Sequence, residues 1–168
     1  MTQETLRYAV GQTDLGLILA AVSESGLRLA ILGDDRQALA ADLAARFPGA
    51  ERVEDAAALA PTLRTLAALV AEPSKPVSLQ LDAAGTPLQQ QVWTALRAIP
   101  AGSTASYAEV AAAIGRPTAA RAVAQACAAN PLAVVTPCHR VVRADGGLSG
   151  YRWGVERKRA LLSREARA

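Results

Sequence analysis

Apolar residues in the first half of the chain follow a strand pattern first and a helix pattern afterwards. Three short apolar segments are separated by Gly, Asp or Ser, which predicts a small antiparallel sheet: 6–13, 15–23 and 27–32. Apolar residues four apart then predict a helix that Pro48-Gly49 ends: Leu39, Leu43 and Phe47. This half has the pattern of an α/β unit.

A second helical stretch extends to about Val70, with four leucines on one side: Leu59, Leu63, Leu66 and Leu69. Pro61 is expected near its start or at a kink, because proline cannot donate the backbone hydrogen bond of a helix interior. After Pro73 and Pro76, the segment 77–81 is expected to return to the sheet. We find no set of residues with catalytic potential in this half.

The second half begins with two helix-start signals. Thr86 and Gln89 match a capping box with Pro87 in the first turn, followed by a buried face of Leu88, Val92, Leu96 and Ile99. Ser106 and Glu109 match a second capping box, and Gly115 stops that helix. A further helix is expected over 118–128. Helix, tight turn with Gly, and helix together predict a helix-turn-helix.

The segment 134–142 is an apolar, β-branched run that Pro-Cys-His-Arg interrupts, and we expect it to be strand-like. The only histidine of the chain, His139, directly follows Cys138. A thiolate is the reactive form of cysteine, and an adjacent imidazole can lower the thiol pKa. Pro137 would hold the backbone extended before the cysteine. A cysteine nucleophile is one interpretation; a buried structural thiol beside a core histidine is the other.

Charge is distributed unequally over the 168 residues. Residues 1–83 carry 7 Lys/Arg against 11 Asp/Glu, whereas 84–168 carry 11 against 4, so net charges of −4 and +7 sum to the formal +3. The basic half suggests binding to a polyanion such as nucleic acid, and a solvated basic surface is the alternative. The segment 82–85 is a plausible boundary between two domains, 1–83 and 84–168.

Two cysteines and one histidine are too few to predict a zinc site. No apolar run reaches the length of a membrane span, and the first residues lack a signal-peptide pattern. We therefore expect a protein of the reducing cytoplasm, associated with the nucleoid, in which both Cys127 and Cys138 are free thiols.

The motifs of the second half resemble the O6-alkylguanine-DNA alkyltransferases, especially the Ada-type bacterial proteins. The resemblance covers the segment from Leu88 to Glu165. It rests on Leu88-Gln-Gln-Gln-Val-Trp93, Asn130-Pro131, Pro137-Cys-His-Arg-Val141 and Gly150-Tyr-Arg-Trp-Gly154. Arg7–Gly11 and Leu32–Asp35 resemble the amino-terminal half of these proteins less specifically. The resemblance implies an α/β (α+β) protein with a small ribonuclease-H-like scaffold domain, followed by a helical, winged-helix-like domain that contains the helix-turn-helix.

The resemblance also implies the catalytic residues. Cys138 would accept the alkyl group, with His139 as its general base acting through a water and Glu165 orienting the imidazole. Tyr107 would donate a proton or hydrogen bond to the departing guanine, and Asn130 would tie the recognition helix to the active-site segment. Glu165 follows Leu161 and Leu162 at helical spacing and is expected on a buried face, either in this relay or paired with an arginine. The basic residues of this last helix are expected largely on its other faces: Arg157, Lys158 and Arg164.

The implied DNA-binding residues are Thr118, Ala119, Ala120 and Arg121 together with Tyr107. Small side chains would let the helix approach the minor groove closely, and Arg121 would fill the gap left by a flipped-out nucleotide. An ordinary surface arginine is the alternative for Arg121. The implied substrate pocket consists of Val141, Tyr151, Arg152, Cys127 and Trp93, with backbone carbonyls of Cys138 and Val141 receiving the guanine amino group.

The expected activity is the direct transfer of an alkyl group from O6-alkylguanine, and from O4-alkylthymine, in duplex DNA to Cys138 of a monomeric protein. Attack of a thiolate on carbon needs no metal and no cofactor, and the thioether product makes the reaction irreversible. Three other functions fit parts of the sequence: a helix-turn-helix regulator with an incidental cysteine, an alkyltransferase-like damage sensor, and a cysteine hydrolase. Damage sensors of that kind lack the reactive cysteine, and we find no oxyanion hole for a hydrolase.

Overall fold

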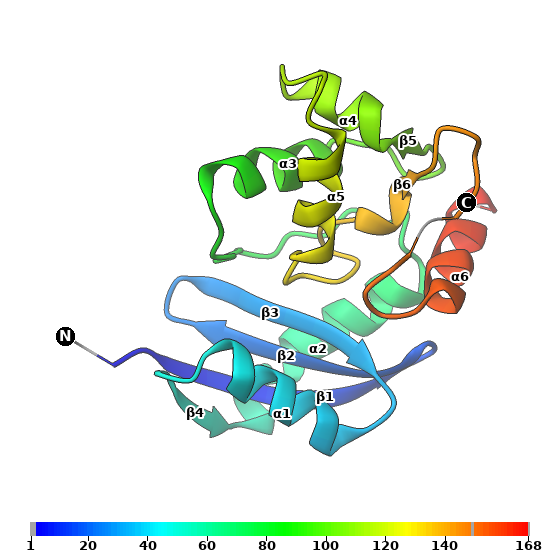
Figure 1. Ribbon diagram of the computed structural model, residues 1–168. Helices are drawn as coiled ribbons and strands as arrows, with labels where there is room; N and C mark the ends of the chain where they lie inside the picture. Colours follow the sequence, from blue (N-terminus) through cyan, green and yellow to red (C-terminus); the bar gives the residue numbers. More distant parts are fainter. Residues whose placement is uncertain (1–2, 149, 168) are drawn as a thin grey trace. The chain divides into compact units, whose positions relative to one another are not determined.

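The protein is an α+β structure that divides into two compact units (Figure 1). The structure is a computed structural model, and it describes residues 3–148 and 150–167. One unit comprises Met1–Ala71 and Pro76–Ala84, and the other comprises Glu72–Lys75 and Gly85–Ala168. The assignment of 72–75 to the second unit was not expected from the sequence. The outer ends of the two domains expected from the sequence, residues 1 and 168, lie outside the described residues.

A four-stranded sheet forms the first unit, in the order β3-β2-β1-β4. Its strands are β1 (Thr5–Thr13), β2 (Gly16–Ser23), β3 (Gly26–Gly33) and β4 (Glu51–Glu54). The three predicted strands are confirmed as an antiparallel set, but β4 pairs with β1 in parallel and makes the sheet mixed. The short β4 contains no apolar run because it is an edge strand with mostly exposed residues, so its sequence gave no signal.

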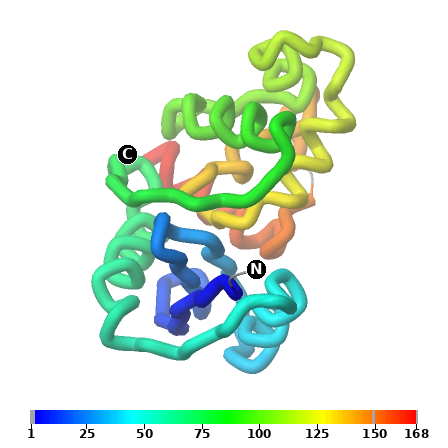
Figure 2. The backbone as a smooth tube through the Cα atoms, turned by 90° about the vertical axis from the view of Figure 1, so that its left-hand side faces the viewer, coloured from blue at the N-terminus to red at the C-terminus, as the bar shows by residue number. Residues whose placement is uncertain are grey.

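Helices α1 (Arg36–Arg46) and α2 (Ala56–Ala71) confirm the two helices predicted for this unit. Figures 1 and 2 show them on opposite sides of the sheet. Four consecutive residues of β3 are buried, Leu29 to Leu32, as expected for a strand covered on both faces. The segment 77–81 returns to the sheet only at its end, where Leu81 forms a single parallel bridge with Leu27 of β3, and it forms no full strand.

The second unit is mainly helical. Its elements are α3 (Pro87–Arg97), β5 (Ala105–Ser106), α4 (Tyr107–Ala113), α5 (Ala120–Ala128), the 3₁₀ turn η1 (Cys138–Arg140), β6 (Val141–Val142) and α6 (Val155–Ala166). Both predicted capping boxes are present, because Thr86 and Ser106 each exchange hydrogen bonds with the residue three positions later. Gly115 has a φ of 76° and ends the first helix of the pair, so α4 and α5 confirm the predicted helix-turn-helix.

The predicted strand over 134–142 is largely wrong. Val134 has a left-handed φ of 70°, and β6 contains only Val141 and Val142, which pair in parallel with β5. A β-branched residue rarely adopts a left-handed backbone, so this conformation depends on the surrounding packing. Turns that the apolar pattern did not reveal therefore shape the chain around Cys138.

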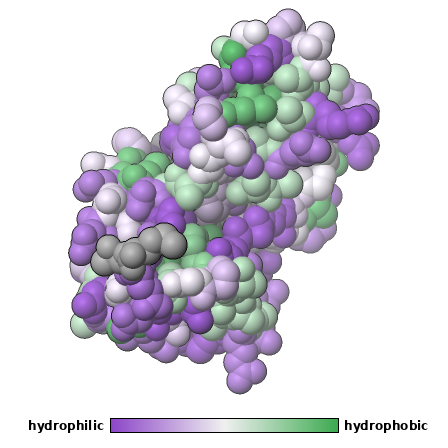
Figure 3. All heavy atoms as spheres, turned by 60° about the vertical axis from the view of Figure 1, so that its left-hand side comes forward, coloured by the Kyte–Doolittle hydropathy of each residue, from purple (hydrophilic) through white to green (hydrophobic). Residues whose placement is uncertain are grey.

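The face drawn in Figure 3 carries hydrophilic and hydrophobic residues side by side. In the described part of the chain, Val155 is the one large hydrophobic side chain classed as exposed. No helix among the described residues is long and apolar enough to cross a membrane.

We predict that Gly85→Ala destabilises the protein. A Cβ at Gly85 would lie 2.5 Å from the Trp93 ring, and Trp93 is held by a hydrogen bond from its indole N–H to the Ala126 carbonyl. Forcing a methyl group into such a contact costs about 1–3 kcal/mol. Thermal unfolding would measure the loss, with Gly49→Ala as the control because a Cβ there meets nothing within 4 Å. Equal melting temperatures for the two variants would contradict this assignment.

Candidate active site

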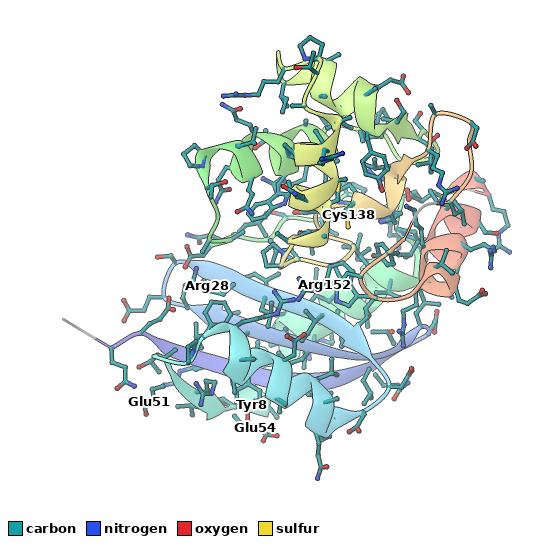
Figure 4. The ribbon with its side chains drawn as sticks, viewed as in Figure 1. Tyr8, Arg28, Glu51, Glu54, Cys138 and Arg152 are labelled. Carbon is teal, nitrogen blue, oxygen red and sulfur yellow. The ribbon has the colours of Figure 1, made fainter. Side chains whose placement is uncertain are left out.

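Cys138 begins η1 and is 5% exposed (Figure 4). Asn130, which is fully buried, holds the segment before it. The Asn130 Nδ2 atom donates to the Thr136 carbonyl at 2.9 Å and to Cys138 Sγ at 3.3 Å, while its Oδ1 atom accepts from the Leu132 amide. One side chain therefore fixes the end of α5, the following turn and the sulfur atom, which is the tie expected for Asn130.

His139 and Glu165 form a buried pair beside this thiol. His139 Nε2 lies 2.5 Å from Glu165 Oε1, and both side chains are at most 1% exposed. Of the buried polar atoms in the described residues, His139 Nδ1 is one of four without a hydrogen-bond partner. The ring thus has one nitrogen engaged with a carboxylate and the other available to accept a proton, which is the arrangement of a general base and its orienting group.

The resting thiol and imidazole are both held in their neutral forms. Burial raises the pKa of Cys138 to about 11, although the hydrogen bond from Asn130 and the charge of Lys158 act in the opposite direction. The pKa of His139 is lowered: burial is the largest cause, the contact with Glu165 acts in the opposite direction, and the charges of Arg140 and Lys158 lower the pKa further. Adjacency of Cys and His in sequence suggested a lowered thiol pKa; desolvation reverses that expectation, so a thiolate must form by proton transfer during the reaction.

Lys158 is a site residue that the sequence reasoning misplaced. It was expected away from the buried face of the last helix, but it is 1% exposed and its Nζ donates to the Val141 carbonyl at 2.7 Å. Lys158, Leu161 and Glu165 are spaced i, i+3 and i+7 and thus share one face of α6. That spacing could have revealed its position. Its positive charge favours the thiolate forms of both Cys138 and Cys127.

Cys138 is one of the residues that line a cavity of about 380 Å³. Its lining residues are Tyr107, Ala124, Cys127, Ala128, Cys138, Gly150, Tyr151 and Arg152. The Tyr151 hydroxyl is buried and has no hydrogen-bond partner among the described residues, and the Tyr151 ring meets Trp153 edge-on at 5.2 Å. The structure therefore brings Tyr107, Cys127, Tyr151 and Arg152 together around Cys138, within the size range of small-molecule pockets.

Two residues expected in the pocket do not line it. Trp93 is 1% exposed and donates its indole N–H to the Ala126 carbonyl, so it supports α5 from behind. Val141 is absent from the lining as well, and its carbonyl already accepts from Lys158. The Cys138 carbonyl accepts the Val141 amide in η1. The structure thus leaves each of these two carbonyls with one protein donor already bound.

The start of α5 contains the residues expected at DNA. Ala119 is the N-cap and makes no side-chain capping bond, Ala120 begins the helix, and Thr118 and Arg121 are exposed. Arg121, Ala124 and Ala128 follow each other at i, i+3 and i+7, so Arg121 is on the face of α5 that lines the cavity. In the described part of the chain, no hydrogen bond or ion pair engages Arg121.

Fold and site together define a protein with a helix-turn-helix whose second helix walls a cavity above a buried cysteine. The family model described as the DNA-binding domain of 6-O-methylguanine DNA methyltransferase matches residues 87–167. The chain is 51% identical over 161 residues to the bifunctional transcriptional activator/DNA repair enzyme Ada of Escherichia coli, covering 96% of this chain and 46% of that protein. It thus spans about half the length of that relative.

Two mycobacterial relatives match over more of their length. A methylated-DNA–protein-cysteine methyltransferase of Mycolicibacterium paratuberculosis is 46% identical over 114 residues, which are 68% of this chain and 69% of that protein. The crystal structure of Mycobacterium tuberculosis OGT in complex with DNA superposes with a TM-score of 0.79 at 34% identity, covering 97% of this chain and 93% of that one. This chain belongs to the O6-methylguanine-DNA methyltransferase family.

We predict that Lys158→Met shifts the pH dependence of Cys138 alkylation upwards. Removing a positive charge disfavours the thiolate, so the pKa of Cys138 should rise by about one unit and the rate at neutral pH should fall about tenfold. The measurement is the rate of reaction with a small neutral electrophile, followed by intact mass in a Cys127→Ala background. Arg159→Met, on the exposed face of α6, is the control and should leave the curve in place. An unchanged curve for Lys158→Met would contradict the assignment.

Proposed function

We propose that this protein repairs O6-alkylguanine, and O4-alkylthymine, in double-stranded DNA by transferring the alkyl group irreversibly to Cys138. One observation carries the proposal: Cys138 lines a cavity walled by α5, and the next residue in the chain, His139, is paired with Glu165. Membership of the family supports it, as does the DNA complex of the Mycobacterium tuberculosis relative.

The reaction begins with generation of the nucleophile. The thiol proton passes through a water to the free Nδ1 atom of His139, and the Nε2–H of the resulting imidazolium donates to the Glu165 carboxylate. Lys158 and the amide of Asn130 stabilise the negative sulfur. A buried thiolate is unfavourable because it is desolvated. In this mechanism it forms only when a bound substrate is ready to react with it.

Transfer then consists of one displacement. The sulfur attacks the alkyl carbon, a sulfur–carbon bond forms, and the carbon–oxygen bond breaks with its electron pair moving to the guanine. Tyr107, which lines the cavity, supplies a proton or hydrogen bond to the departing base. A thioether is not reversed by thiol chemistry, and the proposed mechanism contains no step that restores the cysteine. Each molecule therefore acts once.

To reach the cavity, the alkylated base must leave the base stack of the DNA duplex. Small residues at the start of α5 permit close approach to the minor groove, and Arg121 occupies the vacated position in the stack. The cavity face of α5 supports this role, because Arg121 lies one turn before Ala124, which lines the pocket. Binding of this kind reads the backbone and the lesion with little dependence on sequence.

The proposal assigns different roles to the two halves of the chain. Residues 1–83 would serve as a ribonuclease-H-like scaffold, and residues 84–168 as a winged-helix-like domain that binds DNA and accepts the alkyl group. The concentration of positive charge in 84–168 supports the second role. The protein would act as a monomer at the nucleoid.

We predict one alkyl group per protein molecule. Incubation with duplex DNA containing O6-methylguanine, followed by intact mass and peptide mapping, should place a single methyl group on Cys138 without added metal or nucleotide. Cys127 should stay unlabelled, because burial raises its pKa to about 12. Cys138→Ala should keep affinity for DNA while losing transfer. Continuous turnover, or a label on Cys127, would refute the proposal.

We predict that Arg121→Ala separates base flipping from chemistry. Loss of the side chain that fills the stack should cost about 1–3 kcal/mol, the scale of unstacking a base, and slow repair of duplex DNA about ten- to hundredfold. Free alkylguanine base needs no extrusion, so single-turnover rates on it should stay nearly unchanged.

The control for this prediction is Arg159→Ala, which removes the same charge from an exposed position of α6. It should leave both rates near those of the wild type. His139 and Glu165 variants should slow both substrates, because both reactions need the thiolate. If Arg121→Ala slows duplex and free base equally, Arg121 serves the fold or the pocket instead.

A further inference from the structure

Arg140 is a buried charge at the site whose side chain makes four hydrogen bonds, and the proposed transfer reaction gives it no task. Its side chain is 10% exposed. The Nε atom donates to both Glu165 oxygens, at 2.7 and 3.2 Å, while Nη1 donates to the Ile99 carbonyl at 2.6 Å and Nη2 to the Pro73 carbonyl at 3.3 Å. These contacts fix the guanidinium plane.

One oxygen atom of Glu165 is shared between His139 and Arg140. Glu165 Oε1 lies within hydrogen-bond distance of both His139 Nε2, at 2.5 Å, and Arg140 Nε, at 3.2 Å. A carboxylate paired only with histidine in a buried site would stabilise the imidazolium and raise the histidine pKa. Here the same carboxylate also accepts two hydrogen bonds from the guanidinium of Arg140, a positively charged group that competes with the imidazole for it.

A second cation, Lys158, also disfavours protonation of the imidazole. The charged groups that act on it are Glu165 and Lys158 of α6 and Arg140 of its own segment. Burial is the largest cause that lowers the pKa of His139; Glu165 raises this pKa, and the charges of Arg140 and Lys158 lower it further. Arg97 of α3, which packs against η1, donates to Thr136 Oγ1 at 2.7 Å and adds another cation near the active-site turn.

We propose that Arg140 is a positioning residue that shares the Glu165 carboxylate with His139 and thereby keeps the resting imidazole uncharged and able to accept the thiol proton. The inference deepens the function proposed above and rests on it for its catalytic meaning. Arg140 touches neither the sulfur nor the cavity, so it acts through Glu165. Two backbone carbonyls hold it in place, which a lysine with one ammonium group could not reproduce.

The experiment uses the fact that His139 is the only histidine of the chain, so one imidazole resonance reports its titration without assignment. In the wild type, NMR should show a neutral ring at pH values where an exposed histidine, with a pKa of about 6.5, is half protonated. Arg140→Met removes the competing cation, so the titration should move upwards by about one pH unit or more. Arg140→Lys keeps the charge and should stay closer to the wild type.

A second readout separates this role from simple support of the fold. Arg140→Met should react slowly with free O6-benzylguanine at pH 7 and recover at higher pH, where His139 is again neutral. A purely structural defect would lower the rate at every pH. The amide spectrum verifies folding, and Arg140→Gln replaces the methionine variant if that one is unfolded.

The titration of His139 tests the role of Arg140 separately from the alkyl-transfer experiment, which tests the proposed function. A wild-type histidine that titrates at or above the ordinary value, or an Arg140→Met titration that does not rise above the wild-type one, overturns the role of Arg140. Neither result depends on methyl transfer. If His139 titrates below the ordinary pH but no alkyl group is transferred, the proposed function is refuted. The role of Arg140 in keeping the imidazole uncharged would still stand.

Discussion

The interior of the second unit must accommodate an ionised carboxylate, and the arrangement of Glu165 satisfies that constraint. A buried carboxylate is costly unless each oxygen is paired, and here one oxygen contacts His139 and Arg140 and the other contacts Arg140. These contacts attach α6 to η1. Because η1 begins with Cys138, the same contacts set where the sulfur lies relative to the imidazole.

Two polar side chains near Cys138 hydrogen-bond to the backbone on either side of it. Asn130 supports the turn before Cys138, and Lys158 reaches the carbonyl of Val141 just after η1. A site of this kind does not rely on a permanently charged nucleophile. Its resting thiol and imidazole are neutral, which lowers the cost of burying them. In the proposed mechanism, the charged states form only while the alkyl group passes from the substrate to the sulfur.

The helix-turn-helix links this chemistry to a surface. Helix α5 places Ala124 and Ala128 at the cavity and Arg121 on the same side one turn earlier. Trp93 supports α5 from behind with a hydrogen bond to the Ala126 carbonyl, which explains why an aromatic residue of α3 is needed without lining the pocket. In the proposed function, this one helix would couple recognition of a duplex to access to Cys138.

Local sequence determined the elements whose signals are local. The capping boxes at Thr86 and Ser106, the Gly115 stop and the apolar strand segments predicted α3, the helix-turn-helix and β1 to β3, because caps and periodicity act within a few residues. The motif around Cys138 likewise indicated the family before any coordinates.

Only the tertiary structure decided what depends on distant partners. The segment before Cys138 forms turns instead of a strand: Val134 has a left-handed backbone, and the Asn130 side chain hydrogen-bonds to the backbone of Leu132 and Thr136 on either side of it. Lys158 entered the core because the Val141 carbonyl receives its ammonium group, and the thiol pKa rose because desolvation outweighs the nearby cation. Burial and long-range pairing are properties of the folded chain, so a residue's immediate neighbours in sequence do not contain them.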